Sequence, residues 1–167
     1  MEQKKNADIH SLIYDWNRAG EVRTPPFPVE LDDETLRDGL QSPSVTSPPL
    51  EEKKKILHLM NDLGIDTADI GLPGAGKEVT ATTLELAKEI SRCGLHIAAN
   101  CASRTVEADI VPIAEISQKA GIPVEACLFI GSSPIRQYAE DWTMEKMLDH
   151  TRKSVSFAVA HSLPVMF

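Results

Sequence analysis

The sequence is short of positive charge. It has 17 lysines and arginines against 25 aspartates and glutamates, so its formal net charge is −8 at pH 7 and its isoelectric point lies near 5.1. Nucleic acids and anionic membrane surfaces repel a chain of this charge, which argues against both as targets. We therefore expect small molecules or other proteins as partners, and no nucleic acid or membrane.

Long apolar runs and paired cysteines are also missing. No run approaches the ~20 apolar residues that cross a bilayer, and residues 1–8 have no apolar core of the signal-peptide type. Cys93, Cys101 and Cys127 are odd in number and lack the short paired spacing of a zinc site. We expect a cytoplasmic protein whose cysteines are reduced, small buried side chains rather than metal ligands or nucleophiles.

The five histidines lack the spacing of a metal site. They stand at positions 10, 58, 96, 150 and 161, with no His-x-His or His-x₃-His pair among them. The sequence therefore predicts that none of them binds a metal, and that His58, His150 and His161 lie on helix surfaces.

What the sequence does contain is a unit of strand, polar loop and helix that repeats at roughly the 30 residues of a βαβ unit. Strands are predicted at 29–36, 67–71, 96–101, 123–130 and from 163 onward, and helices at 47–63, 78–92, 106–120 and 143–160. A short helix at 9–18 and a proline-rich link precede them. Such alternation requires a parallel α/β sheet with right-handed crossovers, either a (β/α)₈ barrel or an open doubly wound sheet.

An eight-stranded TIM barrel usually takes about 250 residues. As a barrel, the 167-residue chain would hold four strand–helix units and the start of strand five. We expect residues 1–28 to form the N-terminal helix and link, and residues 29–167 to form an incomplete (β/α)₈ barrel as the catalytic domain. Exposed sheet edges and apolar helix faces would favour association, so we predict a homo-oligomer.

Particular residues mark the predicted helix ends and inward faces. Gly64, Gly94 and Gly121 each follow a helical pattern and end it. Ser47, which precedes two prolines, is a plausible N-cap for the helix at 47–63. Large apolar residues at helical spacing predict the buried stripes of two helices, namely Ile56, Met60 and Leu63 on the first and Met144, Met147, Leu148, Val155 and Val159 on the last.

The loops that follow the strands are polar, which places the chemistry at the carboxyl ends of the strands. Arg37 and Asp38 stand just before Gly39, where the first strand breaks. Neighbours on a strand project to opposite faces, so pairing between these two would be geometrically poor. Asp is a hard oxygen ligand for Mg²⁺, Mn²⁺ or Zn²⁺, and Arg suits a carboxylate or a developing oxyanion. The alternative is a surface loop neutralised by its own charges.

A glycine-rich loop follows the second strand. Residues 71–77 match the spacing of a phosphate-binding loop as far as Lys77. Glu78 then occupies the position where that motif needs Ser or Thr to hold Mg²⁺, which argues against nucleotide hydrolysis. The start of the following helix would still attract a phosphate or carboxylate weakly.

Two more loops carry polar candidates. Ser132, Ser133 and Arg136 follow the fourth strand. The guanidinium of Arg136 is suited to bind a substrate carboxylate. The alternative interpretation is that Arg136 is a solvated surface side chain. The loop expected after the third strand, at 100–104, allows the same two interpretations.

Residues 33–43, with the sequence DETLRDGLQSP, resemble the first-strand signature of the DRE-TIM metallolyase family. This family includes isopropylmalate, citramalate and homocitrate synthases and hydroxymethylglutaryl-CoA lyase. Supporting matches stand at 70–73 after the second strand, at 104–110 opening the third helix and at 129–135 after the fourth strand. The resemblance extends over most of the chain from about residue 29 onward, and it implies the N-terminal half of a TIM barrel.

The resemblance implies roles for residues at the end of the first strand. The metal-binding aspartate falls on Asp38, the catalytic arginine on Arg37, and Gln41 matches the glutamine that supports the site. In synthases of this family a divalent metal holds the oxygens of a 2-oxo acid, while the arginine stabilises charge as the acetyl-CoA enolate attacks. The implied substrates are thus acetyl-CoA and a 2-oxo acid, and the implied cofactor is Mg²⁺, Mn²⁺ or Zn²⁺.

The resemblance also implies substrate-binding residues farther along the chain. Ser132 and Ser133 match a polar pair near the substrate, and Leu72 matches the strand-two position that shapes the side-chain pocket. Arg136 stands where the synthases commonly have a histidine. The implied function is an acyltransferase of the 2-isopropylmalate synthase type, with a pyruvate carboxyltransferase domain that serves leucine biosynthesis.

Two alternatives stay open. Residues 37–41 are closer to the lyase, which cleaves a carbon–carbon bond, whereas Ser42 and Pro43 are closer to the synthases. The family's acidic residue on strand five and its His-x-His ligands on strand seven have no counterpart in the sequence, so we expect the chain alone to be inactive. The second alternative is a non-catalytic half barrel that serves binding or assembly.

Overall fold

The computed structural model describes residues 26–167, and the helix predicted at 9–18 lies outside the described residues. The strands are β1 (Asp32–Asp33), β2 (Thr67–Asp69), β3 (Ala98–Arg104), β4 (Val124–Phe129) and β5 (Val165–Met166). The α-helices are α1 (Leu50–Leu63), α2 (Lys77–Cys93), α3 (Glu107–Ala120), α4 (Pro134–Glu140) and α5 (Met144–Ala160), and two 3₁₀ turns are η3 (Gly39–Gln41) and η4 (Pro73–Ala75).

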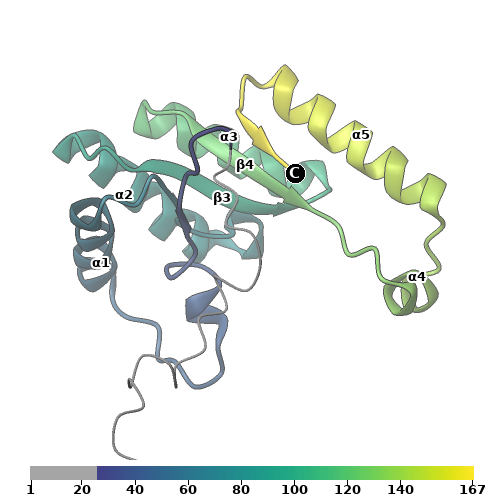
Figure 1. Cartoon of the computed structure of the whole chain (residues 1–167), viewed down its shortest axis with the longest axis horizontal. Helices are drawn as coiled ribbons and strands as arrows, with labels where there is room; N and C mark the ends of the chain where they lie inside the picture. The colour runs from purple at the N-terminus through teal and green to yellow at the C-terminus, as the bar shows by residue number, and fades with distance from the viewer. Residues whose placement is uncertain (1–25) are drawn as a thin grey trace, which may run out of the picture.

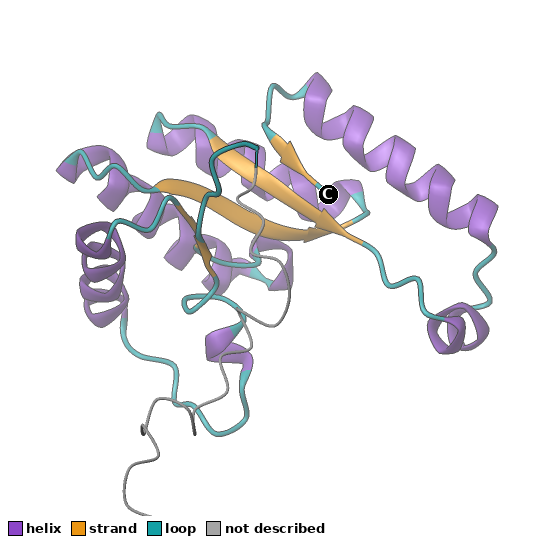
Figure 2. Cartoon of the chain, viewed as in Figure 1, coloured by secondary structure: helices purple, strands orange, loops and turns teal. Residues whose placement is uncertain are grey.

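The five strands form one parallel sheet in the order β1-β2-β3-β4-β5. An open doubly wound sheet reverses its strand order at a switch point, whereas a barrel adds each strand beside the previous one. Figures 1 and 2 show α1, α2, α3 and α5 following one another along the sheet in the same order as the strands. The predicted α/β class and incomplete (β/α)₈ barrel are therefore confirmed.

The two faces of the sheet differ sharply in polarity, because alternate residues of a strand project to opposite sides. One face packs against the helices and forms the apolar core, whose largest fully buried side chains include Leu57, Ile70, Leu86, Ile97, Ile110, Ile113, Ile116 and Val124. The register pairs Asp69 with Asn100, and Asn100 with Glu125, on the other face. This second face is the interior side of the barrel, and it is polar.

The predicted glycine stops are confirmed, and the predicted start of α1 is wrong. Gly64, Gly94 and Gly121 all cap helices in the left-handed conformation. However, α1 begins at Leu50 after an extended Pro49 at ψ 161°, and no side chain of the described residues caps it. Ser47 lies too early to serve as the N-cap because Pro48, which would then be the first helical residue, precedes Pro49 and is held out of the helical conformation.

The buried stripes of α1 and α5 also differ from the prediction. Leu63 is 80% exposed, and Leu57 is fully buried in its place. On α5, three of the apolar residues predicted to face inward are exposed, namely Met144, Leu148 and Val159. The buried residues of that helix are Met147, Ser154 and Ala158. Ser154 and Ala158 are small and allow a close contact between helix and core, whereas Met144, Leu148 and Val159 lie to the side of that contact.

Three element boundaries differ in ways that matter for the site. The strand predicted at 29–36 contains only β1, and the chain then turns, with the Arg37 and Gly39 amides both donating to the Glu34 carbonyl. The third strand continues to Arg104, so residues 100–104 lie in the sheet rather than in a loop. The loop predicted after β4 contains α4, which starts after Ser133.

Within residues 26–167, every helix is too short or too polar to cross a lipid bilayer.

Candidate active site

Arg37 lies at the end of β1 among three carboxylates. Its Nε donates to Asp69 Oδ2 at 2.7 Å, its Nη1 to Asp38 Oδ1 at 2.9 Å, and its Nη2 to Glu34 Oε2. The side chain is only 19% exposed. Burial lowers its pKa, but the hydrogen bond to Asp69 and the three negative charges outweigh that effect, so the pKa of Arg37 is raised. The guanidinium is therefore a fixed positive charge in a fixed orientation.

Asp69 is the residue that fixes this orientation, although it stands in none of the motifs described above. Its carboxylate is 2% exposed, and besides the bond from Arg37 it accepts the Gly71 amide at 3.1 Å and the Ala102 amide at 3.4 Å. Burial raises the pKa of Asp69, and the bonds from Arg37 and the two amides offset part of the rise. One carboxylate thus joins the first three strands of the sheet.

The expectation that Arg37 and Asp38 would not pair is wrong. Their side chains form an ion pair with a 2.9 Å separation between Nη1 and Oδ1. The expectation assumed that both residues lie on an extended strand. In the structure the chain turns after β1, and neighbouring residues in a turn are not forced to opposite faces.

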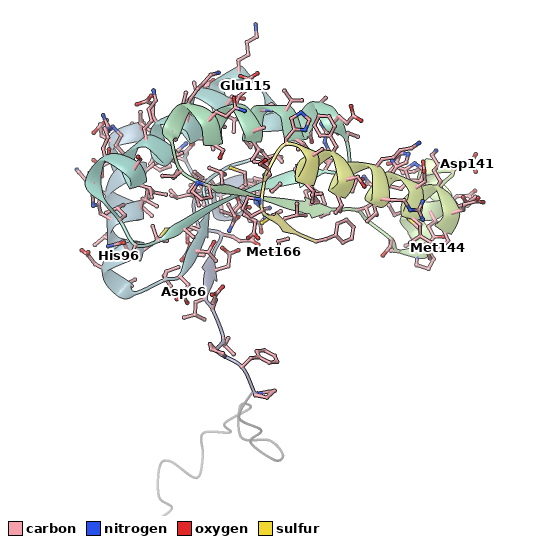
Figure 3. All side chains as sticks on the ribbon, turned by 90° about the horizontal axis from the view of Figure 1, so that it is seen from above. Asp66, His96, Glu115, Asp141, Met144 and Met166 are labelled. Atoms are coloured by element: carbon pink, nitrogen blue, oxygen red, sulfur yellow. The ribbon has the colours of Figure 1, made fainter. Side chains whose placement is uncertain are left out.

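Two cavities meet at Arg37. The first lies on the polar face of the sheet, where Asp32, Glu34, Asp69 and Asn100 line it together with Arg37. Its apolar wall is formed by residues of β3, β4 and the chain end, namely Ala102, Cys127, Leu128, Phe129, Met166 and Phe167. Figure 3 labels Met166 on β5 at this wall.

The second cavity brings together three of the residues singled out from the sequence. Arg37, Gln41 and Leu72 all line it, with Leu36 and Lys53 nearby. Gln41 comes from η3 and Leu72 from the segment after β2. Asp38 stands beside Arg37, and its side chain is 64% exposed. The structure therefore groups Arg37, Asp38, Gln41 and Leu72 at one end of the sheet.

The structure does not bring Ser132, Ser133 and Arg136 to this group. The Ser133 hydroxyl caps α4 by accepting the Arg136 amide at 3.2 Å, and the Ser132 carbonyl accepts a bond from Gln137. The guanidinium of Arg136 lies 5.9 Å from the ring centre of Trp142. In Figure 1, α4 projects away from the sheet. The Ser133 and Arg136 side chains and the Ser132 carbonyl therefore make contacts within α4 and its flanks.

Asn100, one of the polar candidates predicted at 100–104, lines the first cavity from β3 rather than from a loop. It is fully buried, and its Nδ2 donates to Asp32 Oδ1 at 2.7 Å and to Thr67 Oγ1 at 2.9 Å. Its Oδ1 has no hydrogen-bond partner among the described residues. A buried acceptor without a partner is a place where a water or an ion can bind.

The glycine-rich loop after β2 packs directly on the helices. A Cβ on Gly71 would lie 2.3 Å from the Thr83 hydroxyl, and one on Gly74 would lie 2.4 Å from the Asp109 carboxylate. Asp109 is itself held by Arg104, with Nε to Oδ2 at 2.6 Å. The two glycines are therefore explained by close packing of the loop against α2 and α3.

The charges around Arg37 and Asp38, a region called the mouth below, suit a divalent cation. The set of metal ligands there is incomplete. Three carboxylates surround the Arg37 guanidinium, so the cluster carries an excess of negative charge. Asp38 offers a single exposed carboxylate, whereas a stable site needs about three protein ligands. Among residues 26–167, the group of three close potential ligands lies elsewhere, at His58, Glu89 and Cys93. Asp38 fits as one ligand of a larger set.

A comparison with known families matches residues 28–166 to the family described as HMGL-like. The chain belongs to the HMGL-like family. It is 28% identical over 142 residues to a homocitrate synthase, AksA, from Methanosarcina mazei, an alignment that includes 85% of this chain and 33% of that protein. It is 31% identical over 141 residues to a 2-isopropylmalate synthase from Stenotrophomonas maltophilia, an alignment that includes 83% of this chain and 26% of that protein.

A 2-isopropylmalate synthase from Aquifex aeolicus is 34% identical over 137 residues, with 78% of this chain and 24% of that protein included. The predicted resemblance to the DRE-TIM family is therefore confirmed. This HMGL-like chain spans about a quarter to a third of the length of the curated relatives it matches.

Proposed function

We propose that this HMGL-like chain carries the arginine-bearing part of an acyltransferase site, where acetyl-CoA condenses with a 2-oxo acid as in the 2-isopropylmalate synthases. The observation that supports this most is the fixed Arg37 guanidinium, which borders both cavities. Three of its five N–H groups are engaged with acids among the described residues. Two N–H groups remain for a substrate oxygen.

Arg37 would act on the charge that develops during condensation. Attack by the acetyl-CoA enolate turns the carbonyl oxygen of the 2-oxo acid into an alkoxide, and a positioned guanidinium stabilises such an oxyanion. Asp69 acts through Arg37 as a positioning residue, since it holds Nε from the buried side. Gln41 and Leu72 line the cavity on the other side of the guanidinium, where they would contact the side chain of the 2-oxo acid.

Asp38 would hold the divalent metal, Mg²⁺, Mn²⁺ or Zn²⁺, together with ligands from outside the described mouth. Once bound, such an ion supplies Lewis-acid polarisation of the 2-oxo acid carbonyl. Ser132, Ser133 and Arg136 stay proposed substrate contacts, which requires α4 to lie closer to the mouth when substrate is bound. The proposed setting is leucine biosynthesis in the cytoplasm.

Calorimetric titration of Mn²⁺ into the chain tests the metal part of this proposal. We expect binding that is no tighter than roughly millimolar, in line with a site that has few ligands, and that is lost in Asp38→Ala. Asp62→Ala is the matched control because Asp62 is an exposed acid on α1. Binding that persists in Asp38→Ala, or that is lost equally in the control, contradicts the assignment.

Product assays separate the reaction types. With Mn²⁺, acetyl-CoA and a panel of 2-oxo acids, release of free CoA thiol would identify condensation. Formation of acetyl-CoA from 3-hydroxy-3-methylglutaryl-CoA would identify cleavage instead. We expect neither product from the chain alone, but metal-dependent binding of a 2-oxo acid that Arg37→Lys weakens. A chain that binds no 2-oxo acid with or without Mn²⁺ would instead be a non-catalytic half barrel.

A further inference from the structure

A second group of metal-ligating side chains lies between α1 and α2. His58 Nε2 is 3.0 Å from Glu89 Oε1, and Cys93 Sγ is 3.4 Å from the same oxygen. All three ligand atoms lie within 4.8 Å of one another. His58 comes from the middle of α1, and the other two residues come from the last turns of α2.

This group is remote from Arg37. The cavities at Arg37 lie where β1 and β2 end, whereas Cys93 is the last residue of α2, just before the chain enters β3. His96, labelled in Figure 3, marks that opposite end of the sheet. None of the three ligands lines either cavity at the mouth.

Two of the three ligand separations are close to those in a tetrahedral zinc site. Zn–N and Zn–O bonds of about 2.0 Å and a Zn–S bond of about 2.3 Å place tetrahedral ligands about 3.3 to 3.5 Å apart. The observed 3.0 and 3.4 Å are close to these values, and the third pair, His58 Nε2 and Cys93 Sγ, lies within 4.8 Å. Imidazole, thiolate and carboxylate together are a donor set for zinc rather than for magnesium or calcium.

The surrounding charges hold the shared carboxylate in position. Arg92 donates to Glu89 Oε2 at 2.8 Å, and Lys54 Nζ lies 3.9 Å from the same oxygen. Both cations therefore engage Oε2 and leave Oε1 turned toward His58 and Cys93. Such outer contacts orient the ligand carboxylates of metal sites.

We propose that His58, Glu89 and Cys93 bind Zn²⁺ through Nε2, Oε1 and the Cys93 thiolate, with water at the fourth position. Binding displaces the thiol proton of Cys93 to solvent and the Nε2 proton of His58, which a neutral imidazole carries at Nδ1 instead, and it replaces two hydrogen bonds to Oε1 by metal–ligand bonds. The ion would join α1 to α2 on the outside of the barrel. This site is independent of the proposed function of Arg37 and Asp38.

Titration of the 167-residue chain with Co²⁺, which replaces zinc and reports thiolate ligation, tests the proposal. We expect a thiolate-to-cobalt charge-transfer band in the near ultraviolet that one equivalent of Zn²⁺ removes. Cys93→Ser should abolish the band. His58→Gln should weaken Co²⁺ binding by at least about 10- to 100-fold, because even the loss of a residue that only contacts a metal ligand lowers metal affinity by that factor. Zn²⁺ should also raise the melting temperature of the wild type and not of Cys93→Ser.

Two control variants identify which residues supply the signal. Cys127→Ser and Asp38→Ala, which alter the first cavity and the mouth, should both keep the band. A band that disappears in Cys127→Ser but persists in Cys93→Ser would overturn the proposal, and so would the absence of any thiolate band in the wild type. Because Cys93 is exposed, its replacement by Ser is not expected to prevent folding.

Discussion

The Arg37–Asp69 ion pair joins a solvent-facing turn to a buried carboxylate. Removing one partner of such a pair leaves the other without compensation, so we expect Arg37→Gln to lower the free energy of unfolding by about 3–5 kcal/mol. Chemical denaturation followed by far-ultraviolet circular dichroism measures this loss.

The double variant Arg37→Gln/Asp69→Asn is the control for that measurement. It removes the buried negative charge together with its partner, so it should recover a large part of the lost stability. A single variant that costs less than about 1 kcal/mol, as for a surface pair, would show that Asp69 is not held by Arg37 in solution.

Gly74 is required where the loop after β2 meets α3. A Cβ at this position would lie 2.4 Å from the Asp109 carboxylate, which also binds Arg104. We expect Gly74→Ala to destabilise the protein by about 1–3 kcal/mol through overpacking, as measured by thermal or chemical denaturation. Gly39→Ala is the matched control, since the nearest atoms among residues 26–167 would lie 3.8 Å from a Cβ there, an ordinary contact distance. Equal losses in the two variants would contradict the packing argument.

Some residues of the site could be predicted from the sequence, but the residues that contact them could not. Arg37 and Asp38 stand in a long motif, so their placement at a strand end could be inferred. Asp69 stands in no motif, and its role depends on the register that sets β2 beside β3. The grouping of His58 with Glu89 and Cys93 likewise depends on how α1 packs on α2, because residues 31 positions apart show no local spacing.

At the scale of elements, Glu89 links α1 to α2. The hydrogen bond from His58 is the main cause that lowers the pKa of Glu89 from 4.5 to about 2, and contacts with Cys93, Arg92 and Lys54 add to it. A carboxyl group with a lowered folded-state pKa stabilises the fold above its unfolded pKa, and that contribution is lost as the pH falls. The relevant window therefore runs from about pH 4.5 down to about 2.

We expect the unfolding free energy, measured with a chelator present, to fall more steeply through this window in the wild type than in Glu89→Gln. The difference between the two curves isolates Glu89 from the other acids of the chain. Glu115→Gln is a suitable control, because Glu115 pairs with Lys119 on an exposed face of α3. Parallel curves for wild type and Glu89→Gln would contradict the prediction.

The elements themselves were predicted with uneven success, for reasons that lie in local chemistry. The glycine stops at Gly64, Gly94 and Gly121 were predictable because left-handed backbone favours glycine at a helix end. The start of α1 was not, since consecutive prolines delay the helix beyond Ser47. Helix α4 was missed although Ser133 and Pro134 are a usual helix start, because it is only seven residues long.

At the scale of the whole molecule, apolar side chains gather around an unpaired strand edge. Among the described residues β5 pairs only with β4, and Phe129, Met166 and Phe167 are exposed there. Exposed edges and apolar patches favour association between chains. We expect the chain to self-associate, more strongly at high salt, because salt screens the repulsion that arises from a net charge of −8.

Met166→Lys tests this expectation by placing a charge on the edge strand. Size-exclusion chromatography with light scattering should show a smaller average mass for this variant than for the wild type at equal concentration. Leu63→Lys, which adds the same charge at an exposed apolar residue of α1, should leave the mass unchanged. An equal decrease in both variants would mean that net charge, and not the β5 edge, controls association.

The sequential strand order has a consequence for how the chain forms in the cell. Each strand from β2 to β5 pairs with the strand synthesised just before it, so each newly made strand finds a partner that is already present. As the chain leaves the ribosome from its N-terminus, each new strand–helix unit meets an edge that is already in place. The sheet can therefore assemble strand by strand in the order in which its strands are translated.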